Sequence, residues 1–66
     1  MNAGKSIKVA LAKREMSQKE LAEKMKTSTP YISQLVGREH IGMGTVILLA
    51  DAFEMKVSEF LALGED

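Results

Sequence analysis

A stripe of polar side chains runs along one side of a short predicted helix. The residues on that side are two hydroxyl residues, one amide residue and a proline, namely Thr29, Ser33, Gln34 and Pro30. The apolar residues of the same helix fall on the other side at helical spacing, namely Ile32, Leu35 and Val36. Hydroxyl and amide groups both donate and accept hydrogen bonds. The stripe is therefore suited to recognising a partner through directed hydrogen bonds.

The sequence offers few of the side-chain arrangements that catalysis uses. The chain has 66 residues with one histidine, no cysteine and no pair of carboxylates on a predicted facing surface. So short a chain leaves little to build a substrate pocket. We therefore expect no enzymatic activity, no cofactor and no small-molecule ligand. A lone histidine is a poor metal site, so His40 is expected to contact a partner from its loop or to lie in solvent.

The first of two helices that position the polar stripe starts at a capping box. Ser17 and Glu20 have the S-x-x-E spacing, in which each side chain bonds the backbone N–H of the other residue. This spacing predicts a helix over residues 18–25, and Leu21 and Met25 give that helix an apolar face.

The second helix begins after a break in the apolar pattern at Lys26-Thr27. Ser28 or Thr29 can cap it, and Pro30 falls in its first turn, where a missing N–H costs nothing. The sequence therefore predicts a helix over residues 29–36 that is joined to the first by a tight turn.

Three further helices complete an all-α prediction without a strand signal. The apolar spacing predicts helices over residues 3–14, 45–53 and 59–63, with Ser58 placed to cap the last of them. The middle one is apolar along its inner side, at Val46, Ile47, Leu49, Ala50 and Phe53. Such a helix is expected to be the central and most buried one. Five short helices in one small domain over residues 1–66 are therefore predicted.

Charge is distributed unevenly along the chain. The whole sequence has a net charge of zero, but residues 1–40 carry eight Lys or Arg against four Asp or Glu, a net charge of +4. Residues 41–66 carry one Lys against five acidic residues, a net charge of −4. Two interpretations stay open. Small domains often have uneven surface charge, and alternatively a basic face is attracted to phosphate while an acidic face turns away from it.

The sequence also gives an expectation about the compartment. No apolar run approaches the ~20 residues that a membrane span needs, and no signal peptide is recognisable. The lack of cysteine suits a reducing environment. We therefore expect a cytoplasmic protein with no membrane partner.

Residues 17–36 resemble the Cro/CI-type (XRE) helix-turn-helix of phage repressors and bacterial regulators. The resemblance rests on SQKELAEKM at residues 17–25, followed by Ser28-x-x-Tyr31-Ile32-Ser33-Gln34-Leu35, and it extends through residues 49–53 and 57–61. It implies a compact, five-helix, lambda-repressor-like domain. The implied activity is sequence-specific binding of double-stranded DNA in a bacterial cytoplasm, with transcription regulation as the outcome.

The resemblance also assigns roles to individual residues. Those implied to contact DNA phosphates are Gln18, Ser28, Tyr31, Arg38 and His40. The polar stripe is implied to face base edges in the major groove. Gln34 suits the bidentate pairing with adenine N6 and N7, and no Arg is present on this side to pair with guanine. We therefore expect a half-site that favours A·T pairs.

Some of these assignments have ordinary structural alternatives. Tyr31 could pack under its helix instead of sending its hydroxyl to a phosphate. Four cations of the first helix could ring the DNA face or only keep that helix soluble, namely Lys5, Lys8, Lys13 and Arg14.

Two departures from the family pattern carry structural expectations. Lys26 stands where many members have Gly, because the chain there is left-handed, and Lys in that conformation costs roughly 1 kcal/mol relative to Gly. Either the turn at Lys26 is strained or its geometry differs from that of the family. Leu11 and Val36 stand where phage repressors often bury an Arg–Glu pair. Because an apolar pair leaves no uncompensated charge, we expect Leu11 and Val36 to be buried and in contact.

The length of the chain favours a small Cro-like repressor that binds a two-fold operator as a homodimer, with half-sites ~34 Å apart. The dimer surface is expected within residues 41–66, at Ile41, Met43, Phe60, Leu61 and Leu63. Alternatively, Phe60 and Leu61 close the core and only Leu63 is spare. A controller or antitoxin-type regulator, or a module that holds a partner protein, is the competing functional hypothesis.

Overall fold

The computed structural model describes residues 2–65 and contains five α-helices within them. These are α1 (Ala3–Lys13), α2 (Gln18–Lys24), α3 (Thr29–Val36), α4 (Met43–Ala52) and α5 (Val57–Leu63). No strand occurs in residues 2–65, so the predicted all-α, five-helix fold is confirmed. None of the helices described there is long and apolar enough to cross a membrane.

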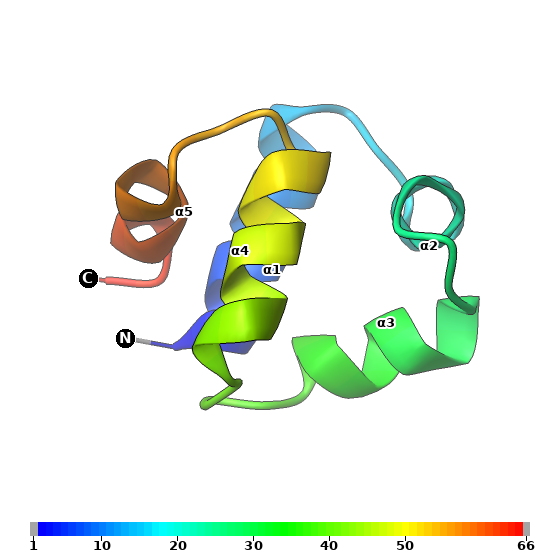
Figure 1. The fold of residues 1–66 in the computed structure, drawn as a ribbon, viewed down its shortest axis with the longest axis horizontal. Coiled ribbons are helices and arrows are strands. Elements are labelled where there is room, and N and C mark those ends of the chain that lie inside the picture. The colour runs from blue at the N-terminus through cyan, green and yellow to red at the C-terminus, as the bar shows by residue number, and fades with distance from the viewer. Residues whose placement is uncertain (1, 66) are drawn as a thin grey trace.

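The core lies between α1, α4 and α5 and extends to α2 and α3. Helix α4 stands in front of α1, with α5 on one side and the α2–α3 pair on the other (Figure 1). The rings of Phe53 and Phe60 stack with centroids 6.1 Å apart where α4 meets α5. The largest fully buried side chains include these two rings and Ile7, Leu21 and Ile32. Each helix therefore contributes an apolar stripe, as its spacing predicts.

Side-chain caps fix the starts of α2 and α3 as predicted. Ser17 Oγ accepts from the N–H of Glu20 at 3.0 Å, and Glu20 Oε1 accepts from the N–H of Ser17 at 3.1 Å. Ser28 Oγ accepts from the N–H of Tyr31 at 3.3 Å, so Ser28 and not Thr29 caps α3. Pro30 lies in the first turn of α3. These caps satisfy N–H groups that a helix start otherwise leaves unpaired.

The helices α1, α2 and α4 end in the same way, with a left-handed residue that is not glycine. The φ angles are 52° at Glu15, 56° at Lys26 and 56° at Glu54. Behind Lys26, the N–H of Thr27 donates to the carbonyl of Ala22 at 2.9 Å, which is the Schellman arrangement. Of the two alternatives for this turn, the structure therefore has the left-handed one, with a non-glycine residue in it.

Two helix starts differ from the prediction. Helix α4 begins at Met43, two residues before the predicted Thr45, because Gly44 is accommodated in its first turn. Helix α5 begins at Val57, so the prediction that Ser58 caps it is wrong. Glu59 holds the start of α5 instead, since its Oε1 accepts from the N–H of Lys56 at 3.4 Å.

The prediction that α4 is buried along a wide inner side is wrong at Ile47, which is 52% exposed. The core stripe of α4 is narrower and consists of Val46, Leu49 and Ala50, with Phe53 at the helix end. Residue 47 is rotated by ~100° from residue 46. Because four residues already fill the space above α1 and α5, Ile47 is left on the outer side of the helix.

The first turn of α1 holds the chain that follows α3. The N–H groups of Ala3 and Gly4 donate to the carbonyls of Glu39 and Arg38, at 2.9 and 2.8 Å. A Cβ on Gly4 would overlap the carbonyl oxygen of Val36, so only glycine permits this approach. The otherwise unpaired N–H groups of α1 thus anchor the segment that carries Arg38.

Leu11 and Val36 are predicted to be buried and in contact. Of this prediction, the structure confirms the burial of Leu11, which is 9% exposed. Val36 is half-buried. Its backbone lies against Gly4, and Gly4 precedes Leu11 by ~10 Å along the axis of α1. Both side chains do join the apolar core, so no charge is buried where they lie.

Candidate nucleic-acid interface

Helices α2 and α3 form one unit joined by the left-handed turn at Lys26. They pack against each other, and α3 also packs against α1 (Figure 1). Ile32 and Leu35 attach α3 to the core, with 0% and 2% exposure. The opposite side of α3 is exposed along its length, at Thr29, Pro30, Ser33 and Gln34. The fold therefore presents the whole predicted polar stripe to solvent.

A side-chain hydrogen bond joins the two helices of this unit. Ser33 Oγ donates to Oε1 of Gln18 at 2.7 Å, from the middle of α3 to the first residue of α2. Gln18 is half-buried while Ser33 is exposed. The bond uses the acceptor end of the Gln18 amide and leaves its NH₂ group to donate outward. The structure therefore brings Ser33 and Gln18 together, and both residues are predicted from the sequence to contact DNA.

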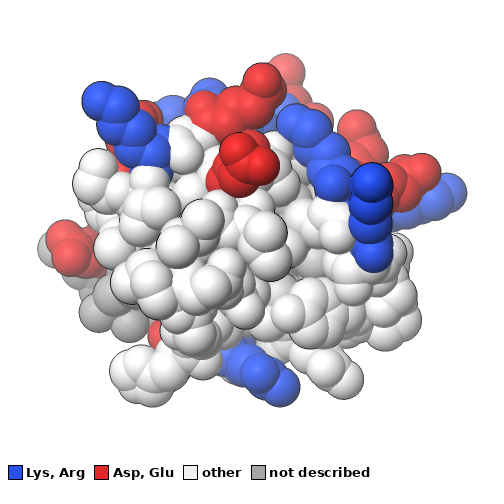
Figure 2. All heavy atoms as spheres, in the orientation of Figure 1, with Lys and Arg blue, Asp and Glu red and all other residues white. Residues whose placement is uncertain are grey.

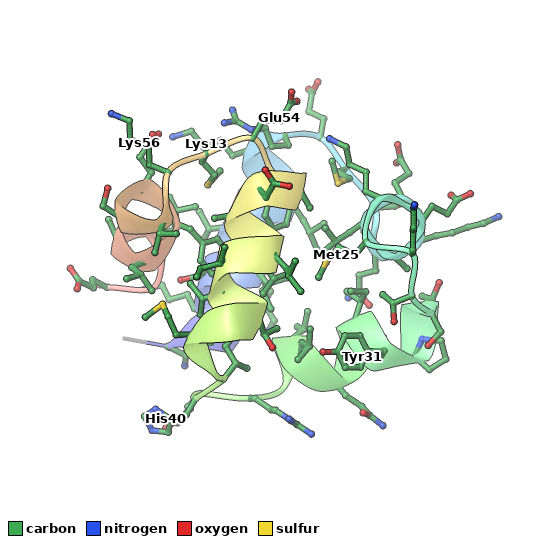
Figure 3. All side chains as sticks on the ribbon, in the orientation of Figure 1. Lys13, Met25, Tyr31, His40, Glu54 and Lys56 are labelled. Carbon is green, nitrogen blue, oxygen red and sulfur yellow. The ribbon has the colours of Figure 1, made fainter. Side chains whose placement is uncertain are left out.

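The other residues assigned to phosphate are exposed at the edges of the unit. Ser28 is exposed at the start of α3, and Tyr31 projects from α3 with 38% exposure (Figure 3). Arg38 is exposed in the segment between α3 and α4, and His40 projects from the same segment beyond the start of α4 (Figure 3). Tyr31 is thus not packed under its helix.

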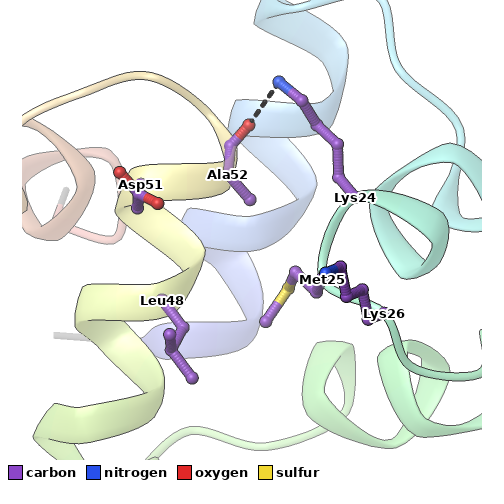
Figure 4. A pocket seen from close by; sticks show the side chains of 6 residues that line it. All are labelled: Lys24, Met25, Lys26, Leu48, Asp51 and Ala52. Carbon is purple, nitrogen blue, oxygen red and sulfur yellow. Dashed lines mark hydrogen bonds between the residues drawn. The ribbon is translucent and has the colours of Figure 1, made fainter.

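Arg14 and Lys24 are used within the fold, at the C-terminal end of α4. Arg14 Nε donates to the carbonyl of Phe53 at 2.8 Å. Lys24 Nζ donates to the carbonyl of Ala52 at 2.9 Å, which is the dashed line in Figure 4. Lys24 also pairs with a carboxylate oxygen of Glu54 at 3.8 Å. Cations stabilise the negative end of a helix and its unpaired carbonyls. Arg14 therefore has a structural role at the end of α4 that the sequence analysis did not predict, while its assignment to the DNA face stays a prediction.

The residues predicted for the dimer surface separate into three groups. Phe60 is 0% exposed and stacks on Phe53, so the prediction that it belongs to the dimer surface is wrong. Ile41, Leu61 and Leu63 are half-buried against the core. Met43 is 57% exposed on α4. Phe60 fills the core because α5 must cover the far end of α4, as the alternative interpretation held.

The sequence analysis missed the exposure of Ile47 and Leu48 and the positioning roles of Gly4 and Arg14. The turn angle of α4 offered a signal, since residues 43, 47 and 48 lie within an arc of ~140° opposite the core stripe. Gly4 and Arg14 gave no signal, because their partners lie more than thirty residues away. Within residues 2–65 no group of three or more His, Cys, Asp or Glu is placed to hold a metal ion.

A capped α3 that is fixed from behind by apolar residues and exposes a polar stripe, braced by α2, defines a helix-turn-helix DNA-binding protein. Its family follows from a direct comparison. The chain belongs to the Cro/C1-type helix-turn-helix DNA-binding family, whose profile matches residues 6–66. The resemblance drawn from residues 17–36 is thereby confirmed. A search of curated proteins finds no match.

Proposed function

We propose that this protein is a homodimeric repressor that reads a two-fold operator in double-stranded DNA through α3. The observation that carries the proposal is the polar stripe of α3, which is exposed throughout while Ile32 and Leu35 hold the helix from behind. A helix presented in this way fits the major groove, which is wide enough to admit it.

Base readout is assigned to the polar stripe. Gln34 carries the bidentate donor and acceptor that match adenine N7 and N6. Ser33 and Thr29 offer hydroxyls that suit several base edges, and Pro30 offers an apolar surface for a thymine methyl group. The operator half-site is therefore expected to favour A·T pairs.

Phosphate contacts are assigned to the rim around the stripe. The NH₂ of Gln18 and the N–H groups of α3 beside Ser28 are donors that suit a phosphate oxygen. Tyr31, Arg38 and His40 add exposed groups on the neighbouring surface. Such contacts fix the register of a protein on DNA without reading its sequence.

Repression follows from occupancy. One copy contacts few base pairs, so two copies bind half-sites ~34 Å apart and together exclude other proteins from the operator. Cytoplasmic location in a bacterium, with a bacterial or phage gene, is the setting that suits such a regulator.

Selection from a random duplex library followed by footprinting tests the proposal, because it yields site, symmetry and spacing together. We expect a two-fold site bound with a Kd of about 10⁻⁸–10⁻¹¹ M, and affinity that falls steeply with salt. Fluorescence titration against random duplex DNA at two salt concentrations provides the control. A module that only holds a partner protein would show little salt-sensitive binding in either assay.

A further inference from the structure

The outer side of α4 is an apolar surface with no covering element among residues 2–65. We name it the α4 face and define it by Met43, Gly44, Ile47, Leu48 and Asp51. Its three large apolar side chains are 57%, 52% and 61% exposed, at positions 43, 47 and 48. Helix α4 is the front element of the view in Figure 1, and the same view shows a broad area without charged side chains (Figure 2).

The α4 face is not needed for the core of the monomer. Val46, Leu49 and Ala50 already attach α4 to the other helices, each with 2% exposure or less. Adjacent large apolar side chains on a small protein cost hydration free energy unless a partner covers them, and such patches mark interaction sites. The α4 face therefore calls for a partner with an apolar surface.

Gly44 is an independent sign that another chain approaches here. Nothing lies within 4 Å of the place where its Cβ would be, so the monomer has no steric need for glycine. Glycine in a helix costs roughly 0.5–1 kcal/mol relative to alanine. Because Gly44 has no side chain, a second helix can approach the backbone of α4 closely beside Ile47 and Leu48.

A cleft at one edge of the α4 face carries both signs of charge. Its volume is about 160 Å³, and Met25, Leu48 and Ala52 supply its apolar lining (Figure 4). One wall is formed by α2 and the turn after it, where Lys26 is the exposed cation, and the other wall by α4, with Asp51. Lys24 also lines the cleft, but its ammonium is bonded to Ala52 and Glu54 of its own chain. A surface with this arrangement is complementary to itself, because a two-fold axis sets the acidic wall of one copy against the basic wall of the next.

We propose that the α4 face is the surface through which a second copy of this chain docks, in an isologous pair centred on Ile47 and Leu48. The inference rests on the proposed function, in which two copies share one operator. A standard interface buries ~800 Å² of each partner, about one fifth of the 4145 Å² surface of this chain. Because the centre is apolar, pairing should persist at salt concentrations that abolish DNA binding.

Sedimentation equilibrium of the full chain tests this assignment with charge substitutions. Ile47→Glu and Leu48→Glu place an unpaired charge in the proposed interface, so each should weaken dimerisation by about tenfold or more. Val9→Glu is the matched control, since Val9 is an exposed apolar residue, 36% exposed, on α1. We expect Val9→Glu to dimerise like the wild type. Far-ultraviolet circular dichroism would show that all three variants keep their helices.

A single cysteine tests the same contact without adding charge. The chain has no cysteine, so Leu48→Cys introduces the only thiol. Around a two-fold axis through the α4 face the two thiols lie close together and should form a disulfide-linked dimer under mild oxidation. Val9→Cys should pair like the wild type but form little disulfide-linked dimer under the same conditions, because Val9 lies on α1.

Three results would overturn the inference. The first is a wild-type chain that stays monomeric at millimolar concentration with and without operator. The second is that Ile47→Glu and Leu48→Glu dimerise like the wild type. The third is that Val9→Glu weakens dimerisation as much as the substitutions at positions 47 and 48 do. The DNA proposal fails separately, if wild type lacks salt-sensitive binding to duplex DNA. Even without DNA binding, loss of the dimer in Leu48→Glu would still support the α4 face as the dimer interface. If the wild type binds DNA and Leu48→Glu dimerises as strongly as the wild type, only the assignment of the α4 face as the interface is refuted.

Discussion

Ser33 Oγ on α3 donates to Gln18 Oε1 on α2 at 2.7 Å, so a residue assigned to base readout is tied to one assigned to phosphate. The hydroxyl of Ser33 can also accept, and the Gln18 amide can also donate. Both groups therefore keep one hydrogen-bonding function for DNA while they orient each other. The pair is exposed on the Ser33 side, so its effect on folding is expected to be small.

The first prediction concerns this pair. Ser33→Ala and Gln18→Ala should each change the free energy of unfolding by no more than about 0.5 kcal/mol, yet each should weaken operator binding. Because the residues act as a unit, the double variant should lose less affinity than the sum of the single losses. Titration of the four proteins against the selected operator measures this coupling. Strictly additive losses would mean that the two residues contact DNA independently.

The second prediction separates base readout from phosphate contact. Gln34→Ala should lose ~1–3 kcal/mol of operator affinity and relax the preference at one base position. Arg38→Ala should weaken binding to all sequences alike and reduce the salt slope by about one. Both residues are exposed, so folding is not expected to change. Equal losses of Gln34→Ala on operator and random duplex would refute its assignment to a base.

The third prediction uses the left-handed turn between α2 and α3. Lys26 has a φ of 56°, so Lys26→Gly should raise the free energy of unfolding by about 1 kcal/mol. In a domain of this size that corresponds to a Tm increase of roughly 4–8 °C. Lys19→Gly, at an exposed position of α2, is the control and should lower stability by a similar amount. A loss of stability in Lys26→Gly would show that the Lys26 side chain stabilises the turn by more than its strain costs.

The fourth prediction concerns the anchor between α1 and the segment after α3. A Cβ on Gly4 would overlap the Val36 carbonyl oxygen and approach that of Arg38 to 2.9 Å. Both are backbone atoms, so Gly4→Ala should cost ~1–3 kcal/mol, as overpacking does. Gly42→Ala is the control, since nothing lies within 4 Å of its Cβ position. Urea denaturation compares the two, and similar stabilities would show that α1 can shift away from residues 36–38.

Local patterns in this sequence were predictive, and long-range relationships were not. The Ser17–Glu20 capping box depends on a few adjacent residues and occurs in the structure as predicted. The family pattern indicated the turn at Lys26, where the structure has a left-handed residue. The polar stripe was predictable because one turn of helix fixes which residues share a side. The exposure of Ile47 was harder to predict, because the apolar residues of α4 cover a wide arc and the helical angle alone does not fix which edge of that arc meets the core.

The interface residues show the same limit. Phe60 and Leu48 are both large and apolar, and only the packing of α5 across α4 separates a core ring from an exposed side chain. Arg14 is likewise a cation of a type that often contacts DNA. The carbonyl that it binds belongs to Phe53, thirty-nine residues away, so the sequence near Arg14 gives no sign of this bond. Such outcomes depend on tertiary arrangement, which residue type and spacing do not encode locally.

The last prediction follows from that role of Arg14. Its guanidinium donates to the carbonyls of Phe53 and Glu54, at 2.8 and 3.4 Å, and so closes the end of α4. Arg14→Ala should lower the free energy of unfolding by about 1–2 kcal/mol, since it removes hydrogen bonds and a cation at a helix C-terminus. Its affinity for random duplex DNA should stay close to that of the wild type. Lys8→Ala is the control, because Lys8 is also a cation of α1 but is exposed, and it should leave stability unchanged. If Arg14→Ala instead weakened binding to random DNA without lowering Tm, Arg14 would belong to the DNA face after all.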